Sequence, residues 1–106
     1  MIITTTPSIE GKQVAQYLGP VAGEAVLGAN IFRDLFASIR DVVGGRAGGY
    51  QKVLRDGRHM ATEDMVEEAQ ALGADAILAV DFDYESLGET NSMLMVSCNG
   101  TEVKLR

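Results

Sequence analysis

The stretch that decides the fold runs from Ala74 to Arg106 and reads ADAILAVDFDYESLGETNSMLMVSCNGTEVKLR. From Val80 onward, large apolar residues alternate with carboxylates, and successive side chains of a strand point to opposite faces of its sheet. The pattern predicts strands over residues 76–87 and 93–105, joined by a hairpin loop over 88–92.

The alternation places three carboxylates, Asp81, Asp83 and Glu85, in a row on one face of the first of these strands. Like charges roughly 7 Å apart repel each other, so the row requires water, cations or partner residues nearby. Its oxygens would be hard ligands, suited to Ca²⁺, Mg²⁺ or Mn²⁺ more than to a soft heavy metal. The row is therefore a candidate metal site. The alternative is a solvated strand face, or one that forms salt bridges to arginines of a neighbouring copy.

Upstream of this stretch, the β-branched residues 2–6 predict a short strand, and residues 14–27 predict a long one. Gly19 and Gly23 share a face of the long strand, which indicates a bulge or another backbone pressing close. Pro20 cannot donate a ladder hydrogen bond and therefore favours an edge position.

Two helices are expected between the long strand and the closing pair of strands. Residues 31–43 have apolar side chains at helical spacing and end at a run of glycines over 44–49. A second helix is predicted from about Tyr50 to Leu72, with Gly73 as its cap. Its expected buried stripe, interrupted by Gly57, is Tyr50, Val53, Leu54, Ala61, Met65, Ala69 and Leu72.

The composition describes one small domain over residues 1–106, with a net charge of −6. That charge argues against nucleic acid and anionic lipid as partners, because both attract Lys and Arg. No apolar run approaches the length that spans a bilayer, and the N-terminal residues lack a basic leader. A single cysteine suits a reducing compartment, so we expect a cytoplasmic protein.

Two other groups of residues contain side chains that occur in binding sites. Gly45, Arg46 and Tyr50 combine bare backbone amides, a guanidinium and a helix start, which could hold an anion, although a simple hinge is the alternative. Cys98 and His59 lie far apart in sequence and lack metal-binding spacing. Cys98 is in phase with apolar neighbours, which predicts a small buried residue.

Several short motifs occur in order along essentially the whole chain: Gly19–Gly23, Ile31–Asp41, Gly44–Arg46 with Tyr50, Gly73–Ala76, Asp81–Glu85 and Met95–Ser97. Together they resemble the YbjQ-like family. The resemblance implies an α+β fold, specifically a dodecin-like two-layer α/β sandwich whose small antiparallel sheet is covered by helices. It also implies assembly into a homopentameric ring, and the family carries a label as a heavy-metal-binding domain without an established biochemical role.

These observations favour an oligomeric binding or scaffold module that holds a divalent cation or a small molecule at a subunit boundary. Asp81, Asp83 and Glu85 would supply the negative field, with Arg46 and Tyr50 as polar contacts. The alternative is an enzyme whose active site forms between subunits, with Asp83 or Glu85 as general base and Arg46 orienting an anionic substrate.

Overall fold

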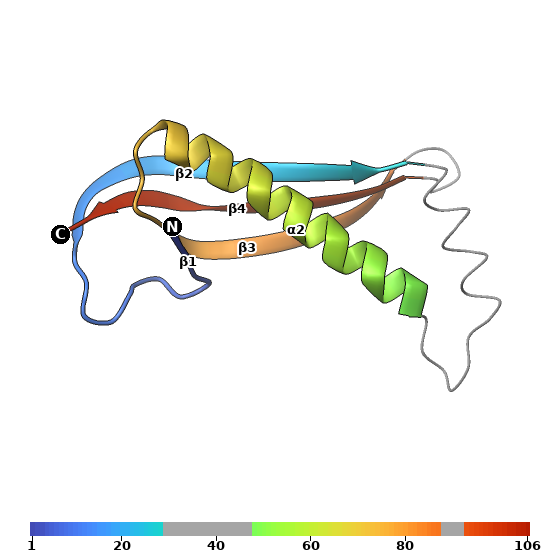
Figure 1. Cartoon of the computed structure of the whole chain (residues 1–106), viewed down its shortest axis with the longest axis horizontal. Helices are drawn as coiled ribbons and strands as arrows, with labels where there is room; N and C mark the ends of the chain where they lie inside the picture. Colours follow the sequence, from blue (N-terminus) through green and yellow to red (C-terminus); the bar gives the residue numbers. More distant parts are fainter. Residues whose placement is uncertain (29–47, 88–92) are drawn as a thin grey trace.

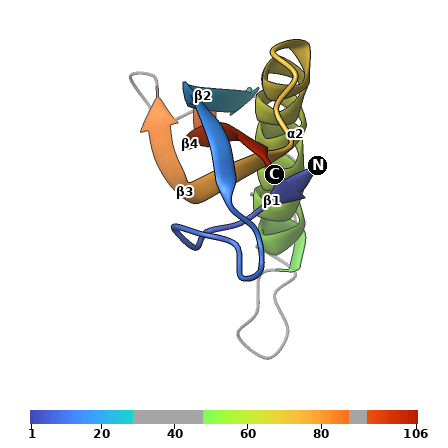
Figure 2. The same ribbon diagram turned by 90° about the vertical axis from the view of Figure 1, so that its left-hand side faces the viewer.

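The computed structural model of the chain describes residues 1–28, 48–87 and 93–106. Its elements are strand β1 (Ile2–Ile3), strand β2 (Val14–Leu27), helix α2 (Gly48–Ala71), strand β3 (Ala76–Leu87) and strand β4 (Met93–Leu105). The strands form one sheet in the order β1-β3-β4-β2, and α2 lies across one face of it (Figures 1 and 2). The α+β class is therefore confirmed.

The three long strands begin and end at the predicted residues, and β2 lies at the edge of the sheet as Pro20 indicated. The prediction of a purely antiparallel sheet is wrong, because β1 pairs with β3 in parallel. β1 is also shorter than expected: the Thr6 amide donates to the Thr4 hydroxyl at 3.1 Å, and the regular strand ends at Ile3 although the Thr4 amide still donates to the Ile77 carbonyl at 3.0 Å. The predicted helix over 31–43, most of the glycine run and the loop over 88–92 lie outside the described residues.

Strand β3 contains a bulge that decides which side chains face the helix. Ala79 has a φ of 54°, and the pairing of β3 with β4 shifts between Leu78 and Asp81. Because one extra residue reverses the alternation, Ile77 and Val80 both belong to the core beneath the helix. The residues after Val80 keep this new phase.

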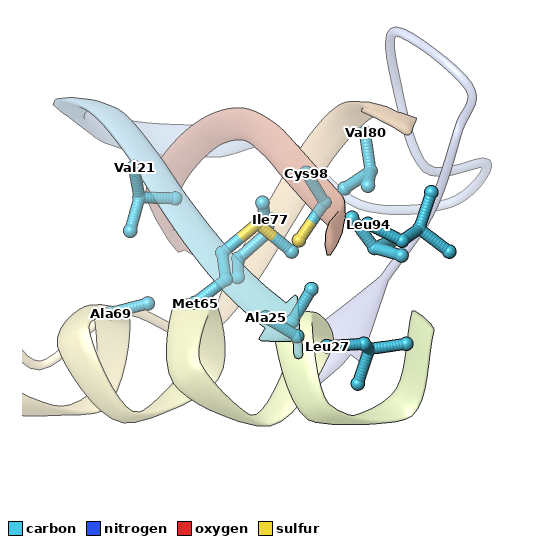
Figure 3. Packing of buried hydrophobic residues seen from close by; sticks show 11 residues of the cluster. Val21, Ala25, Leu27, Met65, Ala69, Ile77, Val80, Leu94 and Cys98 are labelled. Atoms are coloured by element: carbon cyan, nitrogen blue, oxygen red, sulfur yellow. The ribbon is translucent and has the colours of Figure 1, made fainter. Parts of the chain in front are cut away.

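The main core lies between α2 and the sheet, with Ala61, Met65 and Ala69 fully buried on the helix (Figure 3). Gly23 explains how the helix comes so close: a Cβ atom there would lie 2.1 Å from the Ala61 carbonyl oxygen. The sequence predicted either a bulge or a close backbone at the glycines of this strand; the structure shows the close backbone at Gly23 and an irregularity of pairing next to Gly19.

The end of α2 corrects one predicted core residue. Leu72 was expected to be buried but is 61% exposed. The helix ends at Ala71, and Gly73, with a φ of 77°, turns the chain toward β3. The Ala74 amide donates to the Ala69 carbonyl at 3.1 Å, which satisfies an end of the helix as a glycine cap does.

The other face of the sheet is covered only at one end by described residues. A small cluster of Ala76, Leu78 and Val103 is buried there beneath Ile9 of the segment that connects β1 to β2. The rest of this face carries the side chains that alternate with the core residues.

Candidate functional site

The acidic row lies on the sheet face opposite α2, where Asp81, Asp83 and Glu85 are all exposed. The strand register adds a fourth carboxylate that sequence reasoning missed. Asp83 is opposite Ser97 of β4, and Ser97 is opposite Glu24 of β2, so the three residues form one rung across the sheet. Glu24, Asp81, Asp83 and Glu85 are called the acidic face below. The alternation in β2 carried the signal for Glu24, but only the pairing of β2 with β4 connects it to the row.

Within the described part of the chain, no basic side chain forms an ion pair with the acidic face. The ion pair found among these residues joins Lys52 and Asp56 on α2. The Asp64 carboxylate accepts a hydrogen bond from the Glu24 backbone amide at 3.0 Å and leaves the Glu24 side chain exposed. The four carboxylates therefore face outward without a counter-charge from these residues.

The acidic face of a single chain does not form a complete metal site. Among residues 1–28, 48–87 and 93–106, no group of three or more His, Cys, Asp or Glu side chains is placed to hold a metal ion. The geometry explains this, because neighbours on one strand face are roughly 7 Å apart and Glu24 lies two strands away from Asp83. A bound cation requires ligand oxygens at about 2.3–2.6 Å for Ca²⁺, so a second surface would have to complete the site.

Cys98 is buried, with 1% of its surface exposed, as the sequence predicted. Burial raises the pKa of its thiol, and the charges of Glu24 and Asp64 raise the pKa further, against a lowering contribution from the Gly23 backbone. Soft metals bind the thiolate, so a protonated and inaccessible thiol is a poor ligand for them. His59 is exposed on α2, at a position that contributes to no ligand cluster in the described residues.

The predicted anion-binding group cannot be assembled from the described residues. Gly45 and Arg46 lie outside them, and Tyr50 is described only as part of the first turn of α2. Their proposed role stays a prediction.

A groove that the sequence did not indicate lies between α2 and the ends of β3 and β4. Its main hollow has a volume of about 460 Å³, and the described residues that line it are Leu54, Arg58, Tyr84, Glu85, Ser86 and Leu94. It is called the Arg58 groove below. Tyr84 is 46% exposed, and its hydroxyl accepts a hydrogen bond from Arg58 Nη1 at 3.4 Å.

A second feature missed from the sequence is the buried carboxyl of Glu102, which is 2% exposed. Its Oε1 atom has no hydrogen-bond partner among the described residues. Burial raises the pKa of this carboxyl, and the charge of Glu68 raises it further. Its alternation phase in β4 could have flagged it, but its burial depends on the pairing of β4 with β3, where Glu102 is opposite Ile77.

No helix in the described residues is long and apolar enough to cross a lipid bilayer.

Two comparisons with known proteins bear on this chain. A family model with the description "YbjQ_1: Putative heavy-metal-binding" matches residues 1–106. A similar fold occurs in a protein of unknown function from Pediococcus pentosaceus ATCC 25745 that belongs to the DUF74 family. That structure superposes with a TM-score of 0.62 at 15% sequence identity, over 100% of this chain and 98% of the other. The likeness to the solved structure concerns the fold alone.

Proposed function

Because the chain belongs to the YbjQ_1 family along its whole length, we propose that it is a cation-binding module whose site is completed when copies of the chain assemble. The observation that carries this proposal is the acidic face: four exposed carboxylates without a basic partner in the described residues. Such a concentration of like charge attracts cations.

The residues fit a hard cation better than the heavy metal of the family's description. Carboxylate oxygens are the ligands that Ca²⁺, Mg²⁺ and Mn²⁺ prefer. A soft-metal site uses thiolates, whereas Cys98 is buried and its pKa is raised. We therefore assign the acidic face to a hard divalent cation.

Assembly is part of the proposal, because Asp81, Asp83 and Glu85 stand too far apart in one chain to surround an ion. A ring of five copies, each with a net charge of −6, would bring rows from neighbouring subunits together. The long strand β2 lies at the edge of the sheet, so backbone groups that the described residues do not bond are placed for contact with another copy. A dodecin-like ring in the cytoplasm is the assembly that we propose.

The experiment combines native mass spectrometry with calorimetric titration of Ca²⁺, Mn²⁺ and Zn²⁺ into chelator-treated protein. We expect an assembled protein that binds Ca²⁺ or Mn²⁺, and the triple variant D81N/D83N/E85Q should assemble but lose this binding. The matched control is E10Q/E63Q/E67Q, which removes the same charge from exposed positions elsewhere.

Three results would contradict the proposal. Equal binding by the two triple variants would show that the acidic face is not the site. A monomer that binds the cation would refute the role of assembly. Preferential binding of Zn²⁺ that persists in D81N/D83N/E85Q would place a different site elsewhere in the chain.

A further inference from the structure

The Arg58 groove continues along the helix beyond its main hollow. A second hollow of about 270 Å³ adjoins it and is lined by Gln51, Leu54, Arg55 and Arg58. Leu54 and Arg58 line both hollows, so the two lie side by side along α2. The main hollow alone has the size of a small-molecule site, for which about 300–1,000 Å³ is typical.

The guanidinium of Arg58 lies in this groove, and the described residues use only a small part of its hydrogen-bonding capacity. It is half-buried, and its Nη1 donates to the Tyr84 hydroxyl at a long 3.4 Å. No carboxylate of the described chain forms an ion pair with it. A guanidinium has five N–H donors in a planar fork that matches a carboxylate or a phosphate.

Arg55 adds a second guanidinium to the same wall. It is exposed and lies three residues before Arg58, a spacing that makes two side chains neighbours on a helix surface. Both arginines lie in the interior of α2 and not in its last turn, where basic side chains stabilise a helix. Two adjacent arginines beside a hollow match an anionic group of a ligand.

The rest of the groove limits what the ligand can be. Leu54 and Leu94 belong to the edge of the hydrophobic core and give the hollow apolar walls. Glu85 lines the same hollow and would repel a second negative charge. The matching ligand carries one anionic group at one end and an apolar body.

We propose that the Arg58 groove binds a small organic monocarboxylate, with its carboxylate held by Arg58, Arg55 and the Tyr84 hydroxyl and its apolar body against Leu54 and Leu94. This site lies between α2 and β3 and shares Glu85 with the acidic face. It does not depend on the proposed cation function.

The test is a titration of hexanoate into the full-length protein, followed by amide chemical shifts and by calorimetry. We expect saturable binding in the millimolar range or tighter, with shifts at residues of the groove. Acetate lacks the apolar body and hexylammonium has the opposite charge, so both should bind at least about tenfold more weakly.

Three variants separate the groove from general charge effects. R58A should weaken hexanoate binding at least about tenfold, because a charge-assisted hydrogen-bonding partner is lost. Y84F removes a single hydroxyl and should weaken it a few-fold. The matched control K12A removes one positive charge from an exposed residue outside the groove and should leave binding unchanged. If R58A fails to fold, R58K keeps the charge without the planar fork and should still bind more weakly than the wild type.

Binding that is unchanged in both R58A and Y84F would overturn the proposal, as would equal binding of hexanoate and hexylammonium. Failure of hexanoate to bind at millimolar concentrations would also overturn it. Tighter binding of hexyl phosphate than of hexanoate would refute the assignment to a carboxylate. Loss of cation binding in D81N/D83N/E85Q has no bearing on these outcomes, so the two proposals fail independently.

Discussion

Substitution of Gly23 by alanine should be among the most damaging single changes in this protein. The added Cβ would lie 2.1 Å from the Ala61 carbonyl oxygen and 2.5 Å from the Met65 amide nitrogen. A relaxed carbon–oxygen contact is roughly 3.3 Å or longer, so α2 would have to move away from β2 by more than about 1 Å. The clashing atoms belong to the backbone and cannot rotate away.

The cost can be estimated from the packing that this movement disturbs. Overpacking a core costs about 1–3 kcal/mol, and a gap of about 0.5–1 Å already removes a quarter to a half of each dispersion contact. Ala61, Met65 and Ala69 are fully buried on the helix face that would be lifted. We therefore expect G23A to lower the free energy of unfolding by about 3 kcal/mol.

Urea unfolding followed by circular dichroism measures this loss. With a slope of about 1–3 kcal/mol per molar urea for a small domain, the midpoint should fall by about 1–3 M. A22S is the matched control, since it also adds one heavy atom but at an exposed position on the opposite face of β2. Both variants are compared at one protein concentration because assembly contributes to apparent stability. A loss below about 0.5 kcal/mol in G23A would refute the close approach of α2 to β2.

Three further outcomes follow from single buried or bonded groups. The native state binds the Glu102 proton more tightly than the unfolded chain does, because the pKa of this carboxyl is raised in the folded protein. The free energy of unfolding should therefore fall as the pH rises from roughly 4.3 through that raised pKa. Urea unfolding at a series of pH values should show this fall in the wild type and not in E102Q. D75A should lose about 1–2 kcal/mol in urea unfolding, since the Asp75 carboxylate accepts a hydrogen bond from the Leu105 amide at 2.8 Å; D75N, which keeps an acceptor, should lose less. Cys98 should resist a thiol reagent such as DTNB at neutral pH in the folded protein, because its thiol is buried and has a raised pKa. It should react once urea unfolds the protein. Rapid reaction of the native protein would contradict the burial of Cys98.

The sequence predicted the strands well because their signals are local. The alternation after Val80 and the glycines of β2 gave the bounds of three long strands, and Cys98 was placed correctly in the core. The parallel pairing of β1 was missed because two residues carry too little pattern to specify a partner. Leu72 was misplaced because a periodic stripe does not show where the backbone leaves the helix.

The candidate sites show the same difference between residues that are close in sequence and residues that only the fold brings together. The row of Asp81, Asp83 and Glu85 could be predicted because its members lie on one strand, two residues apart. Glu24 joins them only through the register of β2 with β4. Arg58 and Tyr84, 26 residues apart, meet only because α2 lies across the sheet.

By itself, then, the sequence determined the strand faces, the helix cap at Gly73 and the acidic row, since periodicity and backbone preferences act between residues close in the chain. The tertiary structure decided the phase of β3 through its bulge at Ala79, the burial of Glu102 and the walls of the Arg58 groove. Those features depend on contacts between elements distant in sequence, and no local pattern encodes how two such surfaces pack.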